Sequence, residues 1–207
     1  MDTYLLLLRG INVGGHNRLP MADLRAVVSG LGHGDVRTHL QSGNVVCTGT
    51  GSGTGTGSGR GKASGKGSGK ASGKAGVRPD VVADAVSAAI LDELSLTVPV
   101  VARSAAEWAS MVDHNPFVGD EDDPKRLHVT FLAARPEPDR VAALEAQRED
   151  FIPDRFSVVG PDVYLHIPDS YADSPLQNGV LEKRLGQVCT TRNWRTVIAL
   201  AELAGLR

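Results

Sequence analysis

Three short segments of the sequence combine arginine with small polar residues in patterns that suit anion binding. In the first, Arg9 ends an apolar run and is followed by Gly10, Asn12, Gly14 and Asn17. An arginine at a strand end, beside glycine backbone and ahead of a helix N-terminus, favours a bound anion. The alternative is a structural loop, because Asn and Gly adopt positive φ at little cost. The candidate ligand contacts here are Arg9, Asn12 and Gly14.

The second segment contains Arg37 and the turn Ser42-Gly43-Asn44. It places small polar side chains at the tip of an expected hairpin, and the candidate contacts are Ser42 and Asn44. In a βαββαβ unit the first strand lies beside the third, so we expect Asn44 to come close to Arg9. The alternative is an ordinary hairpin turn, since Ser, Gly and Asn satisfy such a turn by themselves.

The third segment, residues 190–196, reads TTRNWRT. Arginine and tryptophan together can hold a planar anion or a base by charge and stacking, so Arg192, Asn193 and Trp194 are candidate contacts. The alternative is a helix start, with Asn193 or Thr191 as the N-cap and an arginine packed on the indole inside the protein.

The other reactive side chains form no recognisable catalytic or metal site. The histidines lack H-x-x-x-H, H-E-x-x-H and Cys/His spacings, so we predict no metal and no cofactor. The nucleophile motif G-x-S-x-G is not present. His128 and His166 fall in expected strands, where each is either a solvent-facing residue or a general base. We interpret the acidic run 119–123 as a solvated loop, and catalytic residues are unknown.

Hydrophobic periodicity predicts two successive units of the order β-α-β-β-α-β. In the first unit we expect strands at 3–8, 36–40, 45–47 and 97–102, with helices starting at Pro20 and spanning 79–94. In the second unit we expect strands at 127–133, 156–159, 163–167 and 188–191, with helices at 136–149 and 176–185. A linking helix capped by Ser104 and a final helix at 194–206 complete the chain.

These elements predict an α+β fold of two ferredoxin-like halves with antiparallel sheets, a linking helix and a C-terminal helix. We place the halves at residues 1–103 and 104–207. No sequence identity between the halves is visible, so the repeat is predicted in architecture only.

Residues 48–76 differ from the rest of the chain, since they hold 12 of the 24 glycines. This Gly/Ser/Lys-rich segment cannot form a core, and we predict a disordered loop that interrupts the first half. Its lysines are followed by Ala or Gly, so the phosphate-loop motif G-x-x-x-x-G-K-[ST] does not match. The segment carries five basic residues and no acid. Subtracting them from the net charge of −2 gives −7 for the other 178 residues.

The composition favours a cytoplasmic, water-soluble protein. Its two cysteines form no disulfide framework, and Cys47 is expected to fill the core. We expect no signal peptide and no membrane span, because no apolar run approaches about 20 residues. The net charge excludes a uniformly basic nucleic-acid binder. The oligomeric state is unknown.

Several segments together resemble the bacterial family called domain of unknown function 1697. They are LLLRGINVGGHNRLPMADL, VRTHLQSGNVVC, KRLHVTFL, VYLHIP and TTRNWRTV. The resemblance implies two ferredoxin-like halves and no established activity. Pro175 stands where the family usually has a lysine, and the Gly-rich segment resembles a lineage-specific insertion.

The favoured hypothesis is a binding protein for a small anionic or nucleotide-like ligand, held where the three arginine segments converge. This requires Arg9, Asn44 and Arg192 to lie together rather than on separate faces. An enzyme of unknown reaction, with His128 or a carboxylate as acid or base, is the first alternative. Nucleic-acid binding on exposed sheet faces is the second, and the aromatic content of 4% does not favour it.

Overall fold

The computed structural model describes residues 1–14, 17–49 and 76–207. Most of the predicted disordered loop, residues 50–75, therefore lies outside the described residues. Its first two residues, Thr48 and Gly49, belong to a strand instead, because they pair with Thr3 and Asp2.

The first half has the predicted order of elements. They are β1 (Asp2–Leu8), α1 (Met21–Gly30), β2 (Gly34–His39), β3 (Asn44–Gly49), α2 (Pro79–Leu94) and β4 (Val100–Ser104). The antiparallel sheet has the order β2-β3-β1-β4, so β3 lies beside β1 as expected. Strand β4 begins later than predicted and follows Pro99, which has no N–H to donate to a neighbouring strand.

The second half repeats this arrangement. Its elements are β5 (Leu127–Leu132), α4 (Pro138–Glu145), a 3₁₀ turn (Arg148–Phe151), β6 (Arg155–Val159), β7 (Asp162–His166), α5 (Asn178–Leu185) and β8 (Cys189–Asn193). The sheet order β6-β7-β5-β8 is that of the first half, which confirms the predicted α+β fold. The predicted helix 136–149 is shorter than expected, because the chain tightens into the 3₁₀ turn after Glu145.

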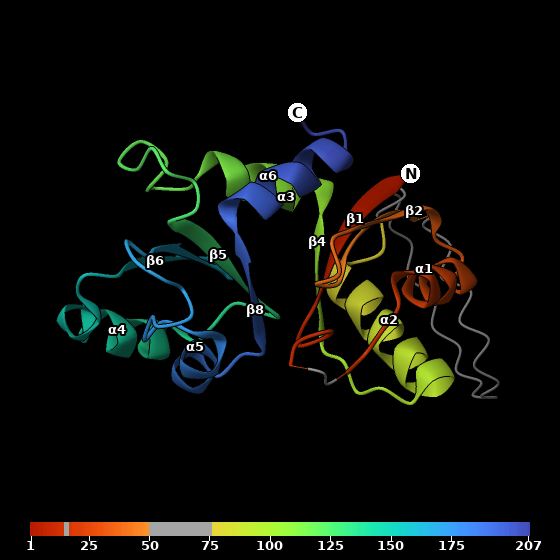
Figure 1. The fold of residues 1–207 in the computed structure, drawn as a ribbon, viewed down its shortest axis with the longest axis horizontal. Helices are drawn as coiled ribbons and strands as arrows, with labels where there is room; N and C mark the ends of the chain where they lie inside the picture. Colours follow the sequence, from red (N-terminus) through yellow and green to blue (C-terminus); the bar gives the residue numbers. More distant parts are fainter. Residues whose placement is uncertain (15–16, 50–75) are drawn as a thin grey trace, which may run out of the picture.

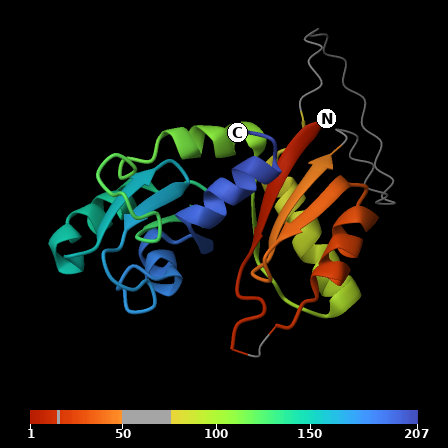
Figure 2. The ribbon, with the colours of Figure 1, turned by 45° about the horizontal axis from the view of Figure 1, so that its top comes forward.

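Helices α3 (Ala105–Asp113) and α6 (Trp194–Leu203) each follow the last strand of a half. Ser104 caps α3 as predicted, in a capping box with Glu107, and Asn193 caps α6 by accepting from the N–H of Arg195. Figures 1 and 2 show both helices lying between the two sheets at the end of the molecule where the C-terminus lies. Both helices contribute apolar side chains to the cluster that joins the two sheets.

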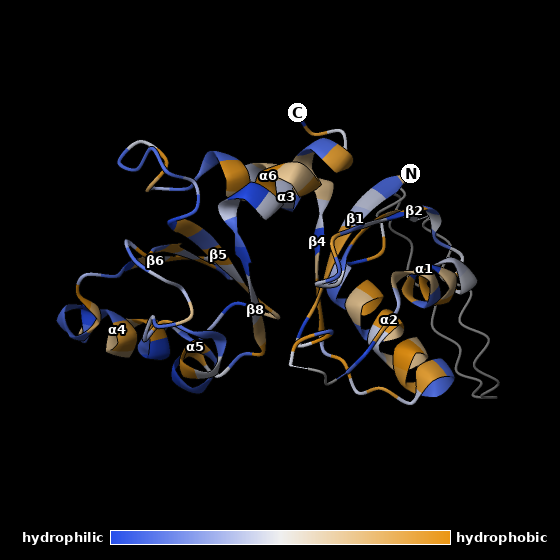
Figure 3. Cartoon of the chain, viewed as in Figure 1, coloured by the Kyte–Doolittle hydropathy of each residue, from blue (hydrophilic) through white to orange (hydrophobic). Residues whose placement is uncertain are grey.

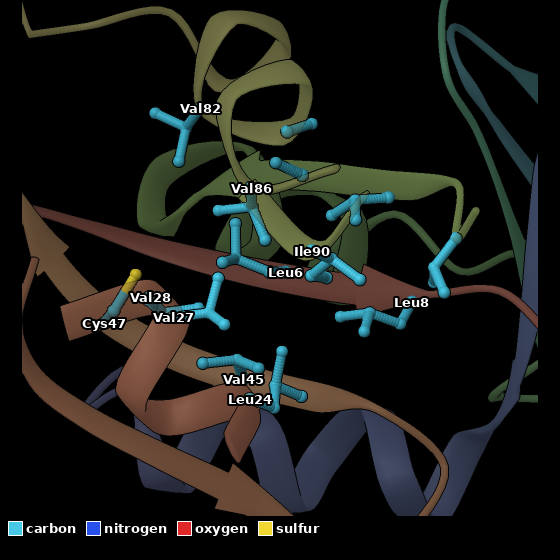
Figure 4. Packing of buried hydrophobic residues seen from close by; sticks show 14 of the residues in the cluster. Leu6, Leu8, Leu24, Val27, Val28, Val45, Cys47, Val82, Val86 and Ile90 are labelled. Carbon is cyan, nitrogen blue, oxygen red and sulfur yellow. The ribbon is translucent and has the colours of Figure 1, made fainter. Parts of the chain in front are cut away.

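Three apolar clusters hold the layers together. In the first half, α1 and α2 cover one face of the sheet, and Figure 4 shows Leu6 beside Val86 and Ile90 of α2, and Val45 beside Leu24 of α1. Cys47 is fully buried in this cluster, which confirms it as a core residue. An equivalent cluster lies under α4 and α5. The third cluster joins the halves, with Leu5 and Leu7 from one sheet, Val129 and Phe131 from the other, and Trp108 from α3.

Candidate functional site

Arg192 connects the two halves and uses every N–H of its guanidinium within the chain. Its Nη2 donates to the carbonyls of Leu8 (2.7 Å) and Ser42 (3.1 Å), both in the first half. Its Nε donates to the Asn44 side chain. Its Nη1 donates to Thr190 Oγ1 (2.7 Å) and to the carbonyl of Thr191 (2.9 Å). With all five donors occupied, Arg192 holds the halves together rather than facing solvent.

Arg103 makes the reverse connection, from β4 of the first half into the second. Its Nη2 donates to the carbonyls of Leu132 (2.9 Å) and Pro161 (3.1 Å) and to Asp162 Oδ1 (2.8 Å). Its Nε also reaches Asp162 Oδ1, and its Nη1 donates to the carbonyl of Ala102. Both side chains of this ion pair are buried.

The two arginines occupy equivalent places in the two halves. Each is the fourth residue of a five-residue strand, and the residue after it caps the next helix. Leu5 pairs with Arg103 as Val129 pairs with Arg192, which makes Leu8 and Leu132 equivalent acceptors. Asn44 and Asp162 are equivalent by the same register. The repeat predicted in architecture alone therefore extends to individual contacts, with an amide at Asn44 in place of the carboxylate at Asp162.

Part of the convergence expected of the arginine segments is present. Asn44 and Arg192 are hydrogen-bonded, and Arg9 directly follows the Leu8 carbonyl that Arg192 binds. The guanidinium of Arg9 forms an ion pair with Glu182 of α5, and its side chain is 28% exposed. Arg9, Asn44 and Arg192 thus lie at one junction of the halves. Figure 3 shows that the end of β8 next to α6 is hydrophilic, while its other end is hydrophobic.

Most of the other predicted contacts have internal partners. Asn12 holds its loop closed, with Nδ2 donating to the carbonyls of Leu19 (3.0 Å) and Gln41 (2.8 Å). Gly14 is described with a φ of +59°, next to residues 15–16, which are outside the described part. Ser42 Oγ accepts from Asn44. Their role in ligand binding stays a prediction.

The last two predicted contacts, Asn193 and Trp194, follow Arg192 at the end of β8 and the start of α6. Asn193 donates to the Lys125 carbonyl at 2.9 Å while it caps α6. Trp194 packs into the cluster between the halves and is 7% exposed. The N-cap alternative therefore describes this segment, with Asn193 rather than Thr191 as the cap.

His128 is a poor candidate for an acid or base. Only 8% of it is exposed, and its ring stacks on Tyr171 at 4.9 Å between centroids. Burial lowers the pKa of His128 to about 4, so the ring is neutral near pH 7. The central strands leave no open sheet face for base stacking either, because the faces free of α1, α2, α4 and α5 are buried between the halves.

A hollow that no sequence motif indicates lies between α3 and the β6–β7 turn. Its volume is about 310 Å³, and Arg103, Ser110, His114, Arg135 and Asp162 are among its lining residues. Asp162 is only 7% exposed, and its Oδ1 takes both bonds from Arg103. No donor in the described part of the chain reaches its second oxygen, Oδ2. Burial raises the pKa of Asp162, against the opposing effect of Arg103.

Arg135 stands at the rim of this hollow, and within the described ranges no carboxylate pairs with it. Its guanidinium lies over Gly160, where an added Cβ would come 3.5 Å from Nη2. Sequence reasoning missed Asp162 and Arg135 because neither belongs to a motif. The signal for Asp162 was its equivalence to Asn44, which requires the strand register.

The acidic run 119–123 is only partly the solvated loop that we expected. Glu121 turns inward, with 12% of its side chain exposed, and accepts from His166 Nε2 (2.9 Å) and the N–H of Asp123 (2.9 Å). These bonds, with a smaller effect of Arg126, lower the pKa of Glu121 from 4.5 to about 2. No group of three or more His, Cys, Asp or Glu in the described residues could hold a metal ion.

The Glu121 contact predicts a pH-dependent contribution to stability. Because the folded-state pKa lies below the unfolded one, the contribution is complete above pH 4.5 and is lost as the pH falls towards 2. We expect the difference in urea midpoint between the native protein and Glu121→Gln to shrink steadily from pH 5 to pH 2. A difference that stays constant over this range would contradict the assignment.

Comparison with known proteins gives a family and a fold. A family model described as "Protein of unknown function (DUF1697)" matches residues 1–57 and 68–164. No curated protein matches the chain. Among solved structures, the conserved bacterial protein SP0830 from Streptococcus pneumoniae is similar over 98% of both chains, with a TM-score of 0.69 and 19% identity. At this identity the similarity shows the fold alone. Within the described residues, no helix is both long and apolar enough to span a membrane.

Proposed function

The chain belongs to the DUF1697 family of proteins of unknown function, so membership supplies no activity, and we propose from its own residues that it binds a small anionic ligand. The observation that carries the proposal is the pair of uncommitted groups at one hollow, the Arg135 guanidinium and Asp162 Oδ2. Arg135 supplies a charged fork for a carboxylate or phosphate. Asp162 supplies an acceptor for a ligand hydroxyl.

Arg135 is the group at the hollow that favours an anion. Arg103 already neutralises Asp162, and the Glu107 carboxylate in the lining keeps its negative charge while its capping box occupies it with Ser104. His114 Nδ1 donates to the Ser110 carbonyl at 2.6 Å, which leaves Nε2 as an acceptor for a ligand hydroxyl. Arg135 is then a cation at the rim that has no ion-pair partner among the described residues.

The junction of the halves around Arg9 is the alternative location for the same ligand class. There, an anion would bind Arg9 beside Ser42 and the loop that holds Asn12 and Gly14. Arg192, Asn44, Asn193 and Trp194 would act behind these contacts by positioning them. The Glu182 carboxylate at Arg9 opposes this location, because a bound anion would have to displace it.

Binding of pyrophosphate and AMP to the full chain, followed by calorimetry and by the amide NMR signals of Gly160 and Asp162, tests the proposal. We expect Arg135→Ala to weaken binding by tenfold or more, since a hydrogen bond to a charged group contributes about 1.5–3 kcal/mol. The matched controls Arg9→Ala and Arg195→Ala, which each remove one arginine elsewhere, should bind as the native protein does. Loss of binding in Arg9→Ala alone would move the site to the junction of the halves around Arg9. If neither anion binds to the native protein, the proposal is wrong.

A further inference from the structure

A second hollow adjoins the first and shares Arg135 and Gly160 with it. Its volume is about 370 Å³, and its walls are apolar, formed by Pro136, Pro138, Val141, Ala142 and Val158 at the start of α4 and on β6. Each hollow alone lies at the low end of the ordinary range for ligand sites, about 300–1,000 Å³. Together they give a two-part site with Arg135 at the division.

The two parts differ in the chemistry that they offer. One part has an acceptor at its base, because Asp162 is buried and its Oδ2 has no donor among the described residues. The other part has prolines and valines, which suit an apolar or aromatic ring. The shared Arg135 offers a bidentate contact for a phosphate, within reach of both parts.

We infer that this two-part site binds a nucleoside monophosphate, an inference that rests on the proposed function. The base packs against Pro136, Pro138 and Val158, a ribose hydroxyl donates to Asp162 Oδ2, and the phosphate binds Arg135. A hydroxyl suits Asp162 better than an ammonium group does, because Arg103 already neutralises that carboxylate. A simple phosphate or hydroxy acid would use one part and leave the apolar part empty.

The test compares AMP with ribose 5-phosphate, which lacks the base, and with 2′,3′-dideoxy-AMP, which lacks the ribose hydroxyls. Calorimetry with the full chain should show that AMP binds at least about tenfold more tightly than ribose 5-phosphate, since stacking or apolar burial of a base is worth about 1–3 kcal/mol. The dideoxy compound should also bind more weakly than AMP.

Variants assign each preference to its part of the site. Ala142→Trp fills the apolar part from an exposed helix position and should remove the preference for AMP over ribose 5-phosphate. Ala143→Trp is the matched control, because it adds the same bulk at the next exposed position of α4, outside the lining. Asp162→Asn should remove the preference for AMP over dideoxy-AMP. Both ligands are measured on the same variant, so a change in the stability of that variant does not affect the comparison.

The outcomes separate this inference from the proposed function. Equal binding of AMP and ribose 5-phosphate, both lost in Arg135→Ala, overturns the nucleotide assignment and leaves the anion site intact. A preference for AMP that Ala142→Trp does not change also overturns it. Failure of every phosphate compound to bind overturns both.

Discussion

Replacing Arg192 by methionine is expected to lower the free energy of unfolding by about 3 kcal/mol or more. The substitution keeps an unbranched side chain but leaves the Leu8 carbonyl, the Ser42 carbonyl and the Asn44 side chain without their common donor. Buried acceptors that lose a partner cost about 1–3 kcal/mol each, and several are lost together. At a typical urea dependence of about 2 kcal/mol per M, the urea midpoint should fall by about 1.5 M.

Arg195→Met is the matched control, since Arg195 is an exposed arginine three positions from Arg192 on the following helix. We expect it to change stability by less than about 0.5 kcal/mol. Arg192→Lys should recover only part of the loss, because an ammonium group has three donors in place of five and cannot reach all the acceptors. An Arg192→Met protein as stable as Arg195→Met would show that these bonds do not hold the halves together.

The internal contacts of Arg192 explain why the sequence of its segment resembles a ligand site. Arg-Asn-Trp is a combination that suits a stacked anion, and the sequence shows no acid close to it. In the structure the segment faces another part of the same chain, and backbone carbonyls take the place of the anion. Carbonyl acceptors carry no sequence signature, so a pattern of side-chain types could not reveal them.

The fold was more accessible to sequence reasoning than the site was. Strand β1 and helix α2 were predicted almost residue by residue, because apolar spacing and Pro79 mark them clearly. Strand β8 was placed too early and too short, since Thr190, Arg192 and Asn193 do not form an apolar run. Its pairing with β5 and the acceptors supplied by the other half stabilise it instead.

The correspondence of individual residues between the halves is not visible in the sequence for a related reason. The residues that correspond, Arg103 with Arg192 and Asp162 with Asn44, are few and widely spaced, and their surroundings differ in type. What the halves share is the geometry of a strand that ends in an arginine and a helix cap. Only the strand register aligns these positions, and the register in turn points to Asp162 and the hollow beside it.

Arg103→Met is expected to be as damaging as Arg192→Met at pH 7, but for a different reason. It leaves the buried Asp162 carboxylate without its cation, and breaking a buried ion pair in this way costs about 3–5 kcal/mol. The double variant Arg103→Met/Asp162→Asn removes the isolated charge and should recover part of that loss. Urea unfolding of the single and double variants measures both effects.

The pH dependence distinguishes the two arginines. Burial already raises the pKa of Asp162 above its ordinary 3.8, and Arg103 is the main group that lowers it. Without Arg103, the pKa of Asp162 in the folded state rises further. The destabilisation caused by the isolated carboxylate is then complete above that folded-state pKa, and it fades as the pH falls towards the pKa of Asp162 in the unfolded chain. The stability deficit of Arg103→Met should therefore shrink between pH 7 and pH 4.

Arg192 donates to an amide and to neutral oxygens, so the deficit of Arg192→Met should stay level over the same range. Parallel deficits for the two variants would show that Asp162 is not charged beside Arg103, and the hollow would then lack the acceptor on which the ligand proposal depends.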